Sequence, residues 1–168
     1  MSLPLSVEDR LAVCTWSLQP ETPEALLAYL KTIGISKVQI ALDPIRENPA
    51  IWGRYGDLCR ESGISQVSGM MVTVGEDYST MEAIKETGGV VPDSTWPENL
   101  ANFKENILVA KDLGLKLVTF HAGFLPHEPS DPAFAKLMNR IRQIGELFGE
   151  NEMDLGFETG QETAETLK

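Results

Sequence analysis

The chain is poor in several kinds of residue, and each scarcity excludes a class of protein. It has two cysteines and two histidines among 168 residues, and it has no uninterrupted run of about 18 apolar residues. Cys14 and Cys59 lack CxxC spacing and a paired histidine, so we interpret them as reduced packing residues. We therefore expect a reducing, cytoplasmic location, without an export signal or a membrane span.

Basic residues are also scarce relative to acidic ones. The 14 Lys and Arg against 25 Asp and Glu leave a net charge of −11. Such a surface repels phosphate backbones, and no Lys/Arg cluster offsets it, so nucleic-acid binding is disfavoured. Divalent cations and small neutral substrates remain compatible with this charge.

The common catalytic signatures are missing too. The sequence contains no GxGxxG, GxxxxGK[ST], HExxH or GxSxG pattern. Their absence removes the usual evidence for a dinucleotide enzyme, a P-loop NTPase, a zinc protease or a nucleophile-elbow hydrolase.

What the chain does contain is a repeated pattern in which a helix ends at glycine and a strand follows within a few residues. Gly34, Gly63, Gly114 and, more loosely, Gly149 mark these closures. The pattern predicts strands at residues 12–16, 37–42, 66–74, 117–121 and 154–158, separated by helices at 23–33, 49–62, 98–113 and 132–148. Continuous apolar strands favour a parallel sheet covered by helices, in a single domain spanning 1–168.

One connection in this alternation is longer than a simple turn. Residues 75–97 join the third strand to the next long helix, with a possible short helix at 81–87. Long loops in compact domains commonly act as lids or binding loops. We predict that this loop lies at the same end of the sheet as the candidate catalytic residues, and that its Trp96 contacts substrate.

Two predicted strands end in one ionisable side chain. His121 closes the segment Thr-Phe-His-Ala-Gly, and Glu158 closes Gly-Phe-Glu-Thr-Gly. Neighbouring parallel strands bring these side chains to one end of the sheet, where α/β enzymes hold their chemistry. We expect Glu158 in a partly desolvated cleft, where a carboxylate needs a cation or a hydrogen-bonded partner.

Each of these residues has alternative roles. Glu158 could bind a hard metal ion, transfer a proton, form a structural ion pair or cap the next helix. His121 could bind metal, donate a hydrogen bond to substrate or be a satisfied buried imidazole. Trp16 and Gln39 could line the pocket, although Trp16 could equally belong to the core, and Gln161 is a candidate substrate contact.

The segments around His121 and Glu158 resemble the sugar phosphate isomerase/epimerase group of xylose isomerase-like TIM barrels. The resemblance implies a partial (β/α)₈ TIM barrel made of the first five βα units with parallel strands. It also implies that Glu158 binds a divalent metal such as Mn, Mg, Co or Zn. His121 corresponds to a histidine that lies near the substrate in isomerase-like members and binds metal in the related endonuclease IV branch. The family's residues on the sixth, seventh and eighth strands have no counterpart here.

From this resemblance we expect a divalent-metal-dependent isomerase or epimerase of a small sugar or sugar phosphate, acting through glutamate-mediated proton transfer in the complete protein. Two alternatives stay open. One is a metal-dependent phosphodiesterase of the endonuclease IV type, which the acidic charge disfavours, and the other is an inactive truncated barrel that acts as a scaffold. The exposed edges of a partial barrel predict self-association or completion by a C-terminal part.

Overall fold

The computed structural model describes residues 10–128, 130–158 and 162–165. Five parallel strands form one sheet in the order β1-β2-β3-β4-β5, as the alternating pattern predicts. The strands are β1 Val13–Cys14, β2 Lys37–Ala41, β3 Ser65–Met71, β4 Leu117–His121 and β5 Asp154–Glu158. The helices are α1 Thr15–Leu18, α2 Pro23–Ile33, α3 Asp43–Glu47, α4 Pro49–Trp52, α5 Tyr55–Ser62, α6 Met81–Thr87, α7 Trp96–Asp112 and α8 Pro132–Gly149.

Local signals explain where the long helices begin and end. The Thr22 side chain accepts a hydrogen bond from the Ala25 N–H at the start of α2, and Asp131 accepts one from the Ala133 N–H at the start of α8. Each cap is followed by a proline in the first turn, where the missing N–H costs nothing. Helix α2 then closes at Gly34, whose φ of 72° is the left-handed conformation that glycine adopts most readily.

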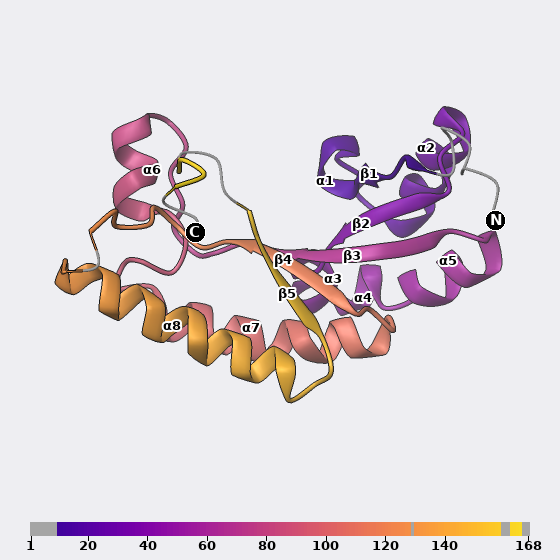
Figure 1. Cartoon of the computed structure of the whole chain (residues 1–168). Helices are drawn as coiled ribbons and strands as arrows, with labels where there is room; N and C mark the ends of the chain where they lie inside the picture. The colour runs from indigo at the N-terminus through magenta and orange to yellow at the C-terminus, as the bar shows by residue number, and fades with distance from the viewer. Residues whose placement is uncertain (1–9, 129, 159–161, 166–168) are drawn as a thin grey trace, which may run out of the picture.

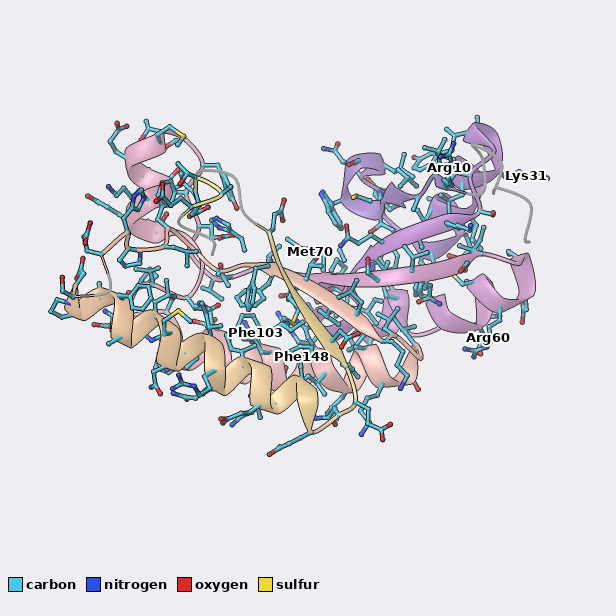
Figure 2. All side chains as sticks on the ribbon, viewed as in Figure 1. Arg10, Lys31, Arg60, Met70, Phe103 and Phe148 are labelled. Atoms are coloured by element: carbon cyan, nitrogen blue, oxygen red, sulfur yellow. The ribbon has the colours of Figure 1, made fainter. Side chains whose placement is uncertain are left out.

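The core lies between the sheet and the helices on its outer face. Helices α7 and α8 run together beneath β4 and β5, and α2 and α5 lie beside the other end of the sheet (Figure 1). Phe103 of α7 and Phe148 of α8 lie on the face of the sheet that these helices cover (Figure 2). The Phe120 side chain from β4 packs against Phe103 at a ring-centroid distance of 5.2 Å.

The opposite face of the sheet carries a row of polar contacts instead of a second helical layer. The Cys14 thiol donates to the Gln39 side-chain oxygen at 3.4 Å, and the Gln39 amide donates to Thr119 Oγ1 at 2.9 Å. The Thr119 hydroxyl in turn lies 3.1 Å from the sulfur of Met70. This row spans β1 to β4 on the face that a closed barrel would enclose.

The first predicted strand is shorter than expected. Ladder pairing stops at Cys14, and residues 15 and 16 belong to helix α1 instead. The reason is a contact with the neighbouring strand: the Ala41 N–H of β2 donates to the Thr15 hydroxyl at 3.0 Å, so a side chain replaces the next backbone acceptor. Trp16 is therefore a helical residue and not a strand end.

Two further boundaries differ from the prediction. The predicted helix at 49–62 is divided into α4 and α5 by a turn at Gly53 and Arg54, and α3 precedes it. Strand β3 ends at Met71 because the next amides have side-chain acceptors: the Val72 N–H donates to Asp43 and the Val74 N–H to Asn99. The short helix expected at 81–87 is present as α6.

Across the described part of the chain, none of the helices combines the length and the apolar character that a membrane span needs.

Candidate functional site

His121 and Glu158 lie side by side at the C-terminal ends of neighbouring strands, as the sequence predicts. They are register partners at the C-terminal ends of β4 and β5, directly after the pair Thr119 and Gly156 on the same face. The long loop after β3 closes over this end of the sheet, with α6 beyond it (Figure 1). Both residues and the loop therefore lie at the same end of the sheet, as the sequence predicts.

The partner of His121 is a residue that the sequence analysis did not identify. Nδ1 of His121 lies 2.9 Å from Oε1 of Glu76, on the loop after β3. The two side chains are only 10% and 9% exposed, so water screens this pair weakly. The same carboxylate oxygen accepts the Gly89 N–H at 2.9 Å. Glu76 thus connects two points of the loop to strand β4.

The interaction between His121 and Glu76 shifts the pKa of each toward its charged form. The hydrogen bond to Glu76 raises the pKa of His121 above its ordinary value, against the lowering effect of burial, and the nearby charge of Glu158 adds to the rise. Burial alone would raise the pKa of Glu76, but the hydrogen bonds from His121 and the Gly89 N–H outweigh it and lower the pKa. Both shifts favour a buried carboxylate beside a protonated imidazole.

Tyr78 completes the loop side of the site. Its hydroxyl donates to the second oxygen of Glu76 at 3.3 Å, and its ring lies 6.5 Å from the His121 ring between centroids. Partial burial, together with the charge of Glu76, raises the pKa of Tyr78 to about 12. The phenol therefore stays protonated at neutral pH and acts as a hydrogen-bond donor.

The loop approaches β4 so closely that only glycine fits. Gly89 has a φ of +65°, and a Cβ there would lie 2.1 Å from the backbone carbon of Ala122. The Val90 N–H donates to the Ala122 carbonyl at 3.1 Å, which extends the contact by one residue. This close approach places the Gly89 N–H within hydrogen-bond distance of the Glu76 carboxylate.

A buried arginine holds the next part of the loop. Arg140 of α8 is 7% exposed, and its Nη1 donates to the carbonyls of Val90 and Val91, at 2.8 Å each. Its other terminal nitrogen pairs with Asp93. Trp96, predicted to contact substrate, instead packs under this guanidinium at 5.0 Å from the ring centroid. Its role as a substrate contact gains no support from this placement.

Trp16 and Gln39 lie nearer the first two strands than His121 and Glu158 do. Trp16 is 41% exposed, so the core alternative is wrong, and it lines a cavity of about 220 Å³ with Ile40, Pro44 and Trp52. Gln39 belongs to the polar row on the uncovered face of the sheet. Their contact with substrate stays a prediction. Gln161 lies outside the described residues.

Glu158 differs from the expectation in its environment. We expected a partly desolvated cleft, but Glu158 is exposed. The reason is its position on the last described strand, because β5 has a paired neighbour on the β4 side only. The carboxylate that is buried and held by hydrogen bonds is Glu76.

The sequence offered a weak signal for Glu76. It follows Gly75 just after the third strand, so it is another ionisable residue beside a glycine at a strand end. Here the glycine precedes the ionisable residue, whereas a glycine follows His121 and Glu158 in the sequence. Arg140 gave no such signal, because it looks like any charged residue within a helix.

The donor set for a divalent metal is incomplete among the described residues. His121 and Glu158 offer one imidazole and one carboxylate, and no group of three His, Cys, Asp or Glu in this part of the chain is arranged to hold a metal ion. Hard cations need more oxygen ligands than this pair supplies. We therefore derive no chemical step through a metal.

Comparison with solved structures identifies the fold. A xylose isomerase domain protein from Planctomyces limnophilus matches with a TM-score of 0.75 and 24% identity over 84% of this chain and 50% of that one. A xylose isomerase-like TIM barrel protein from Mycobacterium smegmatis, in complex with magnesium, matches with a TM-score of 0.59 and 14% identity over 86% and 53%. D-psicose 3-epimerase from Clostridium cellulolyticum H10, solved with D-tagatose, matches with a TM-score of 0.58 and 9% identity over 87% and 50%.

No family model and no curated protein sequence matches the chain significantly. The chain spans about half the length of these three solved structures. The parallel order of five strands, with helices on one face, agrees with five of the eight strands of a TIM barrel. The chain therefore has the fold of a partial TIM barrel, with five parallel strands and the helices between them, and in this fold it is similar to xylose isomerase-like proteins.

Proposed function

We propose that this chain supplies the first half of the active site of a sugar isomerase or epimerase. The observation that carries the proposal is the register pairing of His121 with Glu158 at the C-terminal ends of β4 and β5, under the loop that bears Glu76. TIM-barrel enzymes hold their catalytic residues at this end of the strands. The fold shared with a xylose isomerase domain and a D-psicose 3-epimerase supports this class of reaction.

The proposed chemistry is proton transfer next to a carbonyl group. The Glu158 carboxylate removes the proton from the carbon beside the carbonyl, and the bonding electrons move toward the carbonyl oxygen to form an enediolate. Return of the proton to the former carbonyl carbon, with transfer of the neighbouring hydroxyl proton to the enediolate oxygen, gives the isomer. Delivery of a proton to the opposite face of the original carbon by a second acid, which leaves the first proton on Glu158, gives the epimer. The His121 ring donates a hydrogen bond to the oxygen that gains negative charge.

A divalent cation belongs to the proposal for a completed barrel. Glu158 would supply one oxygen ligand, and His121 would supply one nitrogen ligand in place of its hydrogen bond to substrate. Mg²⁺, Mn²⁺, Co²⁺ or Zn²⁺ would stabilise charge on neighbouring substrate oxygens. The magnesium complex of the Mycobacterium smegmatis protein supports the choice of a divalent ion. The substrate would be a small sugar or sugar phosphate, with Gln39 and Trp16 as proposed contacts. No observation on the described residues favours the phosphodiesterase alternative.

The first prediction concerns Glu158 in a protein that contains this chain and a completed barrel. Glu158→Gln keeps the size of the side chain but removes its basicity, so turnover should fall by roughly 10²-fold or more. The measurement is interconversion of aldose and ketose sugars and of ketose epimers, with circular dichroism to verify the fold. Asp154→Asn, at the other end of β5, is the matched control and should keep its activity. Turnover of Glu158→Gln near that of the parent protein would remove Glu158 from the mechanism.

A further inference from the structure

The carboxylate of Glu76 is surrounded by donors. Oε1 accepts the Gly89 N–H and faces His121 Nδ1, each at 2.9 Å, and Oε2 accepts the Tyr78 hydroxyl at 3.3 Å. An ionised carboxylate has no proton to donate, so the bond to His121 requires a hydrogen on Nδ1. The lowered pKa of Glu76 agrees with this ionised state.

The ring of His121 is fixed by more than this one bond. His121 is 8% exposed, and a Cβ placed on Gly88 would lie 3.2 Å from its Cε1 atom. The ring of Tyr78, a residue that is 67% exposed, lies 6.5 Å from the His121 ring between centroids. The imidazole therefore has little room to turn over and place a ring carbon where Nδ1 faces Glu76. With Nδ1 engaged by Glu76, Nε2 is the nitrogen left for a bound molecule.

We propose that Glu76 is a positioning residue: it holds His121 with a proton on Nδ1 and so leaves Nε2 to act on substrate or metal. The tautomer of a histidine is set by the hydrogen bond that its other nitrogen makes. Carboxylates behind functional histidines orient the ring in this way. The role of Nε2 rests on the proposed function, whereas the tautomer of His121 follows from the described contacts alone.

The test is the tautomer of His121, read by long-range ¹H–¹⁵N correlation of the imidazole rings in the ¹⁵N-labelled 168-residue chain. Spectra are recorded at a pH above the titration of both histidines, so that each ring is neutral. His127, which is exposed, is the only other histidine and serves as internal reference, and His127→Gln assigns the signals. In the parent chain, we expect a protonated Nδ1 and an unprotonated Nε2 for His121.

Three variants separate positioning from charge. Glu76→Ala should lose the Nδ1–H preference and bring the His121 signals toward those of His127. Glu76→Gln should keep the preference, because its amide oxygen can accept the same two N–H bonds without the charge. Glu86→Ala, on the exposed surface of α6 in the same loop, is the matched control and should leave the spectrum unchanged.

Two outcomes would overturn the proposal. One is a parent chain in which His121 carries its proton on Nε2 or shows the same mixture as His127, a result that needs no variant to fold. The other is an unchanged His121 tautomer in folded Glu76→Ala. Because no substrate or metal is present, neither result depends on whether Glu158 transfers a proton, so this proposal and the proposed function can fail separately.

Discussion

At the scale of single residues, Glu76 and Glu158 are two carboxylates in opposite environments. Glu76 is buried, accepts hydrogen bonds on both oxygens and faces an imidazole, whereas Glu158 is exposed on the last described strand. A buried carboxylate with several donors is held in one position, and an exposed one remains free to bind or exchange protons. The difference explains why we assign positioning to Glu76 and proton transfer to Glu158.

The buried pair predicts a pH dependence of stability. His121 has a raised folded pKa, so its contribution is complete below its ordinary value of 6.5 and is lost as the pH rises through the folded value. Glu76 has a lowered folded pKa, so its contribution is complete above its ordinary value of 4.5 and is lost as the pH falls through the folded value. The pair should therefore stabilise the fold most between these two ordinary values.

Urea unfolding of the parent chain and of His121→Gln across this pH range tests the expectation. The difference in free energy of unfolding between the two should be largest in the window between the two ordinary pKa values and should shrink on both sides. His127→Gln, which removes the exposed histidine, should follow the parent chain. A difference between parent and His121→Gln that does not vary with pH would show that the pair is not ionic in the folded state.

At the scale of elements, the loop between β3 and α7 is held to the body of the protein from two directions. Gly89 and Val90 contact the end of β4, and Arg140 reaches the carbonyls of Val90 and Val91 from α8. The loop is long, but these contacts give it a defined course. A loop anchored in this way forms a wall of the site.

The close approach of Gly89 predicts a large effect of a single methyl group. Gly89→Ala would place a Cβ 2.1 Å from the backbone of Ala122, at a φ of +65°. Gly34→Ala is the matched control, because Gly34 has a similar φ of +72° but nothing within 4 Å of the added carbon. The control should lose about 1–2 kcal/mol from backbone strain alone, and Gly89→Ala should lose a further 1–3 kcal/mol, roughly, from overpacking. Urea unfolding measures both, and equal losses would show that the loop does not contact β4 in solution.

The arginine clamp makes a separate prediction. Arg140→Lys keeps the charge but cannot serve both carbonyls and Asp93 with one ammonium group, so buried carbonyls lose their donors. The expected loss in free energy of unfolding is about 1–3 kcal/mol. Lys136→Ala, which removes a more exposed partner of the same Asp93, should change stability much less. Equal effects of the two substitutions would contradict a buried clamp.

At the scale of the whole molecule, both edges of the sheet bring apolar side chains to the surface. Tyr29 and Ile33, one helical turn apart on α2 beside the β1 edge, are 44% and 46% exposed. Phe157 on β5 is 45% exposed, although it packs edge-on against Phe120 at 5.5 Å. In a closed barrel, the neighbouring units would cover these positions.

We therefore expect the 168-residue chain to self-associate when no further βα units cover its edges. Sedimentation velocity should show a concentration-dependent increase in mass for the parent chain and a weaker increase for Phe157→Ser. Leu108→Ser is the matched control, because Leu108 is 65% exposed on α7 but lies on an outer helix away from the edges. A parent chain that stays monomeric over the whole concentration range would refute this expectation.

The order of the elements and the pairing of His121 with Glu158 follow from local patterns in the sequence. Proline starts, glycine ends and apolar spacing are local signals, and they predicted the five parallel strands and the positions of His121 and Glu158. Side chains at the ends of adjacent parallel strands must converge, so this part needed no knowledge of packing. The strand boundaries at Thr15 and Val72 were not predictable, because hydrogen bonds with distant segments end those ladders: Thr15 accepts from the Ala41 N–H, and the Val72 N–H donates to Asp43.

The groups that surround His121 are set by long-range packing. Its partner Glu76 lies 45 positions away in the chain, and Arg140 clamps a loop about 50 positions away. Such contacts depend on how the long loop folds over the sheet, and no local spacing records that course. The same holds for the contact of Trp96 with Arg140 and for the exposure of Glu158, which differs from the expectation. Burial is set by the neighbours that pack around a residue, and sequence patterns specify only which face the residue occupies.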